Sequence, residues 1–169
     1  MNEAYLCEGF RTPIGRFGGT LSSVRPDDML AHVIRKTMEA APNLDPAAID
    51  DCYMGCANQA GEDNRNVARM ATLLAGLPTS VPGTTMNRLC GSGAQAIVSA
   101  VQGLMLGDAD FALAGGAESM SRSPFILPDA RWGAKMGDVR SLDMMLGALN
   151  CPFGTGHMGV TAENVAAEH

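Results

Sequence analysis

The stretch Met86-Asn87-Arg88-Leu89-Cys90-Gly91-Ser92-Gly93 decides how this sequence folds. Residues 82–89 form an extended run that ends at the cysteine, and residues 94–105 carry apolar side chains at helical spacing after it. Cys90 is therefore predicted to lie at a strand-to-helix corner, on the N-terminus of the helix. Free backbone N–H groups and the positive end of the helix dipole favour an anion there, and a reactive thiolate is such an anion.

Two interpretations of Cys90 are open from its residue type. Free cysteine is among the most buried residue types, so a small apolar side chain packed at a helix start is one of them. The other is an activated nucleophile. Gly91 and Gly93 keep the approach to the sulfur clear of Cβ atoms, which a packed cysteine would not need, and so they favour the nucleophile.

Strands and helices alternate on both sides of this corner. Strands are predicted at residues 4–10, 51–57, 82–89 and 110–116. Helices are predicted up to about Ala40, at about 66–75, and after Cys90, where the apolar stripe covers 94–105 and Gly107 ends the helix. Asp27 or Asp28 is the expected N-cap of the first helix. The run 110–116 is continuously apolar and ends in a glycine pair, which is typical of a strand buried on both faces. This order predicts an α/β fold with a largely parallel sheet.

The texture of the sequence changes after Ser119. Residues 120–156 have scattered Pro, Gly and Arg with little periodicity, and only 141–149 are weakly helical. A new helix is predicted from Ala162 onward, without a stop signal before His169. We therefore expect an N-terminal α/β domain over 1–119, the beginning of an inserted subdomain over 120–169, and a larger protein of which this chain is part.

Composition excludes several classes of function. The 169 residues include 12 Lys and Arg against 18 Asp and Glu, a net charge of −6 without a basic run, which disfavours a nucleic-acid partner. Five cysteines, odd in number and irregular in spacing, do not form a disulfide framework. We expect no signal peptide and no apolar stretch long enough to span a membrane. A reducing cytoplasm is the expected location.

Other residues that could carry chemistry have weaker signals. Cys52 and Cys56 are four apart, but no second ligand pair follows at zinc spacing, so buried strand cysteines are expected and no metal site. His32 is expected on a helix surface. A loose basic cluster could contact coenzyme A phosphates or another subunit, although a solvated surface is the commoner outcome. Its members are Arg122, Arg131, Lys135 and Arg140.

Four motifs resemble those of the thiolase family, in the family's order and spacing. They are Arg11–Gly15, Asn87–Gly93, Ala114–Ser121 and Gly156–Ala166. The segment Gly61–Met70 is most similar to 3-oxoadipyl-CoA thiolases, whereas Lys135–Asp138 and His157–Met158 are equally similar to acetyl-CoA acetyltransferases. The resemblance implies a layered α-β-α half with a mostly parallel mixed sheet, followed by the start of a loop domain for substrate binding and tetramerisation.

The resemblance also implies a chemistry. Cys90 is the nucleophile that holds an acyl group as a thioester, and its N–H helps to bind the oxyanion. His157 and Met158 contact the substrate near the pantetheine and acyl tunnel, with loop packing as the alternative for both. Acyl-CoA and CoA are the substrates, and no further cofactor and no metal are expected.

The remaining implications concern the whole enzyme. The base, second acid/base cysteine and oxyanion asparagine of thiolases do not occur in these 169 residues, so the isolated chain is expected to be inactive. A homodimer or homotetramer in fatty acid or aromatic degradation is implied, and the basic cluster is expected to serve assembly. The alternative is a non-catalytic acyl-CoA-binding or assembly module; a decarboxylating ketoacyl synthase ranks lower. Acyl-chain preference and metabolic direction stay open.

Overall fold

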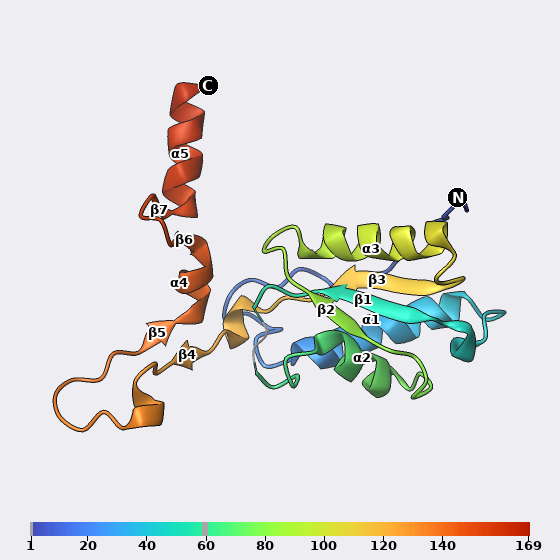
Figure 1. Ribbon diagram of the computed structural model, residues 1–169, viewed down its shortest axis with the longest axis horizontal. Helices are drawn as coiled ribbons and strands as arrows, with labels where there is room; N and C mark the ends of the chain where they lie inside the picture. The colour runs from blue at the N-terminus through green and yellow to red at the C-terminus, as the bar shows by residue number, and fades with distance from the viewer. Residues whose placement is uncertain (1, 59–60) are drawn as a thin grey trace. The chain divides into compact units, whose positions relative to one another are not determined.

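The computed structural model describes residues 2–58 and 61–169, which divide into two units, Met1–Arg122 and Ser123–His169 (Figure 1). Each unit is described by itself. The domain division that the sequence predicts after residue 119 stays a prediction.

A parallel sheet between helices forms the first unit. Its elements are α1 (Pro26–Ala40), η1 (Pro46–Ala48), β1 (Asp51–Gly55), α2 (Val67–Ala75), β2 (Thr84–Met86), α3 (Ser92–Leu106), β3 (Ala112–Gly116) and η2 (Met120–Arg122). The strand order is β2-β1-β3, and both pairings are parallel. Figure 1 shows α3 on one face of the sheet and α1 with α2 on the other. This arrangement confirms the predicted α/β layers.

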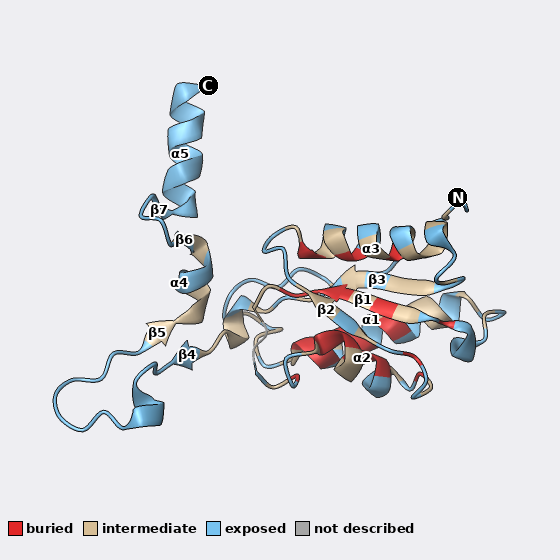
Figure 2. Cartoon of the chain, in the orientation of Figure 1, coloured by how far each residue is buried: buried red, intermediate tan, exposed pale blue. Residues whose placement is uncertain are grey.

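The hydrophobic core lies between the sheet and the pair α1 and α2, where Figure 2 shows most of the buried residues. Alternate residues of a strand share a face, so β1 and the residue after it direct Cys52, Met54 and Cys56 into this core. From α1, Ile34 packs into the same cluster, and from α2, Val67 does so with no exposed surface. The core thus holds β1 in the centre of the unit.

The contact between α3 and the sheet is made by small side chains. Ser92, Ala96 and Ala100 are its buried residues, whereas Ile97 and Val98 are 40% and 47% exposed. By length and composition alone, the window Leu89–Leu106 could cross a membrane, so the expectation that no stretch is long enough was wrong. The helix packs against β1 and β3, 17% of the window is buried, and one such window is weak evidence for a membrane span.

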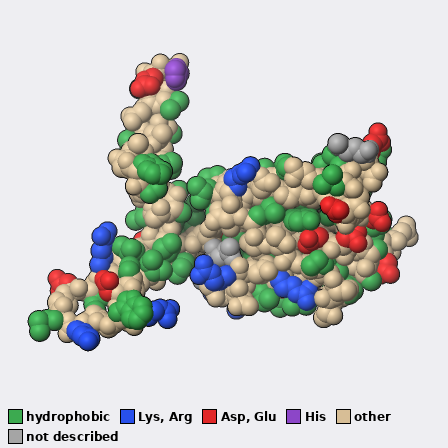
Figure 3. Space-filling view, viewed as in Figure 1, with side chains coloured by type: hydrophobic (Ala, Val, Ile, Leu, Met, Phe, Trp, Pro, Cys, Tyr) green, Lys and Arg blue, Asp and Glu red, His purple; other side chains and the backbone are tan. Residues whose placement is uncertain are grey.

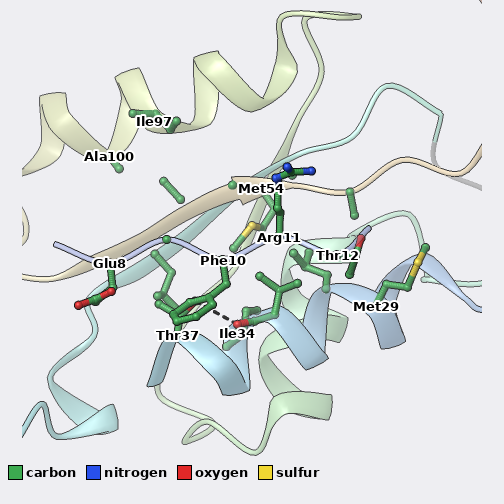
Figure 4. A pocket seen from close by; sticks show the side chains of 18 of the residues that line it. Glu8, Phe10, Arg11, Thr12, Met29, Ile34, Thr37, Met54, Ile97 and Ala100 are labelled. Atoms are coloured by element: carbon green, nitrogen blue, oxygen red, sulfur yellow. Dashed lines mark hydrogen bonds between the residues drawn. The ribbon is translucent and has the colours of Figure 1, made fainter. Parts of the chain in front are cut away.

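The strand predicted at residues 4–10 was wrong. These residues form no helix or strand, and no ladder hydrogen bond joins them to β3 among the described residues. Instead, both segments line a cavity of about 1240 Å³, which α1 and α3 also line. Figure 4 shows Phe10 beside Thr37 and Ile34 of α1, with Ile97 of α3 across the cavity. An apolar extended run becomes a strand only where a neighbour pairs with its backbone.

Two other strands differ from their predicted form. β2 covers three residues of the predicted 82–89, because Pro82 has no N–H to donate and the residues after Met86 turn toward the helix. β3 is not buried on both faces: Ala114 and Gly116 are exposed, since β3 is an edge strand of the described sheet.

The first helix begins at Pro26, before the predicted caps Asp27 and Asp28, and neither aspartate caps it. Arg25 occupies the N-cap position, and Pro26 stands at the first helical position, where a missing N–H costs nothing. Asp27 is buried and accepts an ion-paired hydrogen bond of 2.6 Å from the Arg25 guanidinium. The Asp27 carboxylate therefore pairs with the Arg25 guanidinium and does not cap the N-terminus of the helix.

The second unit is built from short elements. They are β4 (Phe125–Ile126), η3 (Ala130–Trp132), β5 (Leu142–Asp143), α4 (Met144–Leu149), β6 (Asn150–Cys151), β7 (Gly156–His157) and α5 (Met158–Glu168). β4 pairs with β5 and β6 with β7, both antiparallel. The helix predicted at 141–149 is confirmed for its last six residues, and the helix predicted from Ala162 begins at Met158. Figure 3 shows Lys and Arg side chains interspersed with hydrophobic ones along this unit.

We predict that Asn66 stabilises the first unit by joining α2 to β2. Its Oδ1 accepts bonds from Arg69 N–H at 3.1 Å and from the Thr85 hydroxyl at 2.8 Å, and its Nδ2 donates to the Gly83 carbonyl at 3.1 Å. Asn66→Ala removes all three, so the free energy of unfolding in urea should fall by about 1–2 kcal/mol. Asn66→Asp keeps the acceptor and should lose less; equal losses for the two variants would contradict this account.

Candidate active site

A tight turn carries Cys90 from β2 to α3. The N–H of Leu89 donates to Asn87 Oδ1 at 2.9 Å, and Leu89 has a φ of 47°, in the left-handed region. Ser92 closes the turn from the helix side, because its hydroxyl accepts from Arg88 N–H at 2.8 Å and donates to the Leu89 carbonyl at 2.6 Å. Cys90 thus follows a residue whose costly conformation is fixed by hydrogen bonds on both sides.

The backbone of β1 supports this turn from below. A Cβ atom built on Gly55 would lie 2.3 Å from the carbonyl carbon of Ser92 and 2.5 Å from the nitrogen of Gly93. Gly55 is therefore the residue that lets the first turn of α3 rest on the sheet. The register pairs Gly55 with Met86 of β2 and Gly116 of β3, so the contact is at the middle of the sheet.

The carboxyl ends of all three strands meet at this corner. The connection from β1 to β2 runs through α2 on one face, whereas the connection from β2 to β3 runs through α3 on the other. The chain reverses its winding direction here, and parallel sheets bind ligands outside the carboxyl ends of their strands at such a point. The fold therefore places Cys90 where α/β proteins commonly carry function.

The surroundings of Cys90 suit a negative sulfur. Cys90 is exposed, it immediately precedes the cap residue of the 15-residue helix α3, and no acidic residue stands in the first turn of that helix. A helix N-terminus favours negative charge, which is the charge that a cysteine sulfur carries when it attacks. The predicted strand-to-helix corner is confirmed. The large cavity is a separate feature, because Cys90 is not among the described residues that line it.

The other cysteines differ from Cys90 in burial. Cys52 and Cys56 are buried in the core, which confirms the expectation of buried strand cysteines. Burial, reinforced for Cys56 by the charges of Glu118 and Asp63, raises the pKa of each thiol to about 12. Cys151 is half-buried in β6, and a hydrogen bond with Thr155 lowers its pKa. Cys151 is therefore the thiol against which the reactivity of Cys90 should be compared.

His157 and Met158 lie next to each other in the second unit, whereas Cys90 belongs to the first. His157 is the N-cap of α5: its Nδ1 accepts a hydrogen bond of 3.0 Å from the N–H of Gly159. Met158 is the first residue of the helix and is 42% exposed. Both side chains are accessible, and their contact with substrate stays a prediction.

Arg122, one member of the loose basic cluster, is paired with a carboxylate. It belongs to the first unit, where its guanidinium donates two hydrogen bonds to the Glu62 carboxylate, one of them at 2.6 Å. This pairing lowers the pKa of Glu62. Arg131, Lys135 and Arg140 remain as exposed cations of the second unit.

Sequence reasoning missed the residues that hold the corner in place. Gly55, Asn87 and Ser92 were given no role, although the last two stand in the stretch that was singled out. Glu118 was also missed: its carboxylate accepts hydrogen bonds from the N–H groups of Ala57 at 2.8 Å and of the next residue at 3.1 Å. The available signal was position, because a carboxylate that follows the carboxyl end of a parallel strand lies near the ends of its neighbours.

Known sequences and structures are similar to this chain over nearly its whole length. The family model described as the N-terminal domain of thiolase matches residues 4–169. A 3-oxoadipyl-CoA/3-oxo-5,6-dehydrosuberyl-CoA thiolase of Escherichia coli K12 is 54% identical over 98% of this chain and 43% of its own length. Beta-ketothiolase BktB of Cupriavidus necator is 48% identical over 99% of this chain and 42% of its own length.

A solved structure shares the fold. The crystal structure of the Bacillus anthracis acetyl-CoA acetyltransferase superposes with a TM-score of 0.87 at 37% identity, over 94% of this chain and 40% of that one. The chain thus spans less than half the length of each of these proteins.

We predict that Gly55→Ala displaces the first turn of α3. The added Cβ meets backbone atoms of Ser92 and Gly93, which cannot rotate away as a flexible side chain can. The free energy of unfolding should fall by about 1–3 kcal/mol, as for overpacking elsewhere, and iodoacetamide should alkylate Cys90 more slowly. Gly93→Ala is the matched control, because a Cβ there meets no atom within 4 Å. Equal unfolding curves for the two variants would contradict the prediction.

The buried thiols predict a loss of stability at alkaline pH. The pKa of Cys52 is raised from 9.0 to about 12 in the folded chain, so above pH 9.0 the unfolded chain loses this proton first. The unfolded state then binds fewer protons, and the free energy of unfolding falls as pH rises from 9.0 toward 12. Cys52→Ala should flatten this slope in urea titrations, and Cys7→Ala, at an exposed thiol, should not. An unchanged slope in Cys52→Ala would exclude this thiol as its cause.

Proposed function

The chain belongs to the thiolase family, and we propose that its Cys90 is the nucleophile of an acyltransferase that moves acyl groups between coenzyme A thioesters. The observation that carries this proposal is the position of Cys90 between β2 and α3. An exposed cysteine precedes the first turn of α3, with glycine on one side and no acidic residue in that turn. A packed structural cysteine would be buried, as Cys52 is.

The proposed chemistry has two halves. In thiolysis the Cys90 thiolate attacks the keto carbon of a 3-oxoacyl-CoA, and a C–S bond forms. The C–C bond to the acetyl-CoA portion then breaks, and that carbanion takes a proton from an acid. In the second half the thiolate of CoA attacks the acyl-cysteine and restores Cys90. Condensation of two acetyl-CoA molecules is the reverse path, and thioester exchange of this kind needs no metal.

The proposal also needs a donor for the oxyanion. At this turn the N–H groups of Gly91 and Ser92 already donate to the carbonyls of Arg88 and Leu89. We assign the Cys90 N–H to the oxygen of the tetrahedral species. One such donor is typically worth about 3–4 kcal/mol of barrier. His157 and Met158 are assigned to the acyl-CoA substrate.

The proposed substrate is a 3-oxoacyl-CoA of a degradative route, with 3-oxoadipyl-CoA as the first candidate. Support comes from the relative at 54% identity, whose name specifies 3-oxoadipyl-CoA. The relative at 48% is named only a beta-ketothiolase, so shorter 3-oxoacyl groups are the competing substrates.

Assembly and location complete the proposal. We place the protein in the cytoplasm as a homotetramer with no cofactor beyond its CoA substrates. Support for assembly comes from large apolar side chains on the second unit, where Trp132 is 82% and Met136 97% exposed, because such groups are typical of buried interfaces. Irregularly spaced cysteines support a reducing compartment.

The test is acyl transfer to Cys90. After incubation with acetyl-CoA, mass spectrometry of the peptides should find the acetyl group on Cys90; Cys90→Ala should abolish the adduct, and Cys151→Ser should keep it. Acetylation or alkylation of Cys90 no faster than of Cys151 would instead support a non-catalytic acyl-CoA-binding module. Because the acid and base that thiolases require are not in this sequence, the isolated chain should show no sustained thiolysis of acetoacetyl-CoA.

A further inference from the structure

Glu118 lies just beyond the end of β3, at the same edge of the sheet as Cys90. Its Oε2 accepts from Ala57 N–H at 2.8 Å, and its Oε1 accepts from Asn58 N–H at 3.1 Å. The thiol of Cys56 also lies 3.7 Å from Oε1, as a donor. One carboxylate thus takes up three donors from consecutive residues of a single segment.

These donors need a partner because the ladder ends before them. The last ladder bonds run from Cys56 N–H to the Met86 carbonyl and from Ala117 N–H to the Gly55 carbonyl. Ala57 is the first residue without a strand partner. The Glu118 carboxylate takes the place of a strand there, and bonds from N–H groups to a carboxylate are stronger than those to a neutral carbonyl.

The segment bonded to Glu118, Ala57 and Asn58, also contacts the turn that precedes Cys90. The Ala57 carbonyl accepts from Asn87 Nδ2 at 3.1 Å. The Oδ1 atom of the same Asn87 side chain accepts a hydrogen bond of 2.9 Å from Leu89 N–H. Leu89 has the left-handed conformation that directs the chain into Cys90. A continuous path therefore leads from the Glu118 carboxylate through Ala57 and Asn87 to the residue before the nucleophile.

We infer that Glu118 is a positioning residue for Cys90, which acts through the Ala57 backbone and the Asn87 side chain. This inference rests on the proposed role of Cys90 as nucleophile. Glu118 needs to be a carboxylate, because both of its oxygens accept; an amide would turn an NH₂ group toward an N–H donor. Cys56 contributes as a neutral thiol, since its pKa is raised to about 12 by burial and by the charges of Glu118 and Asp63.

Whether Glu118→Gln slows or speeds the alkylation of Cys90 distinguishes a positioning role of Glu118 from an effect of its charge alone. Removing a negative charge near a cysteine favours its thiolate and speeds alkylation. Loss of positioning works the other way, because the sulfur then leaves its fixed place at the start of α3. We therefore expect Glu118→Gln to slow the alkylation of Cys90 although the variant is less negative.

The experiment is a double-mutant cycle in the full chain. Rates of iodoacetamide alkylation at Cys90 are measured across pH by peptide mass spectrometry, with exposed Cys7 as the internal reference. Glu118→Gln and Asn87→Ala should each slow the reaction by roughly 5- to 30-fold, the factor that corresponds to the loss of one or two hydrogen bonds. The double variant should be little slower than the slower single variant, because both changes break one path.

Two control variants complete the design. Glu39→Gln removes the same charge from an exposed glutamate that pairs with Lys36, and it should leave the rate unchanged. Glu118→Asp keeps the charge at a shorter reach and should restore part of the rate. Additive effects of Glu118→Gln and Asn87→Ala would overturn the inference. Faster alkylation of Cys90, or a change confined to the buried Cys52 and Cys56, would overturn it as well.

The outcomes also separate this inference from the proposed function. Acetylation of Cys90 by acetyl-CoA in the parent chain tests the proposed function. If no acetyl group is found on Cys90, its proposed role as nucleophile is rejected. Normal acetylation of the parent with an unaltered rate in Glu118→Gln would reject the positioning role alone.

Discussion

The backbone of β1 passes so close to the first turn of α3 at Gly55 that no side chain fits between them. Because Gly55 is paired with Met86 on one side and Gly116 on the other, this contact falls on the central strand. The helix start is thus held against the central strand of the sheet and not against an edge strand. Cys90, the nucleophile of the proposed function, follows a turn whose direction this contact fixes, and its own side chain stays exposed.

The two faces of the sheet have different roles. One face carries most of the hydrophobic core, and the other positions α3. Large apolar side chains fill the face toward α1 and α2, and there Ile34 and Val67 are almost fully buried. The face toward α3 is covered by Ala96 and Ala100, which let the helix approach closely. A helix that is apolar on both its inner and outer sides also meets the composition of a membrane span. Small residues at the contact and apolar residues outside it thus explain both properties of α3.

The sequence was sufficient for what depends on local pattern. From residue 26 to residue 116 the order of strands and helices, the parallel sheet and the corner at Cys90 follow from periodicity and from glycine positions, and the structure confirms them. Features that depend on a partner were missed. Residues 4–10 have the pattern of a strand but no backbone neighbour, and β3 has the composition of a doubly buried strand but lies at an edge. The bond between Glu118 and Ala57 joins residues 61 positions apart, which no periodicity encodes.

Beyond the carboxyl ends of the parallel strands, backbone N–H groups have no strand to bond to, and in this fold side chains accept their hydrogen bonds. Where a ladder stops, the next N–H groups lose their acceptors, and a buried or half-buried donor without one is costly. Glu118 accepts from such groups beyond β1, and Asn66 accepts in the same way from an N–H group at the start of α2. A free carboxylate at this edge of the sheet would oppose a negative charge on Cys90, the nucleophile of the proposed function. Because N–H groups donate to both of its oxygens, the charge of Glu118 is dispersed, and the same group orders the loop after β1.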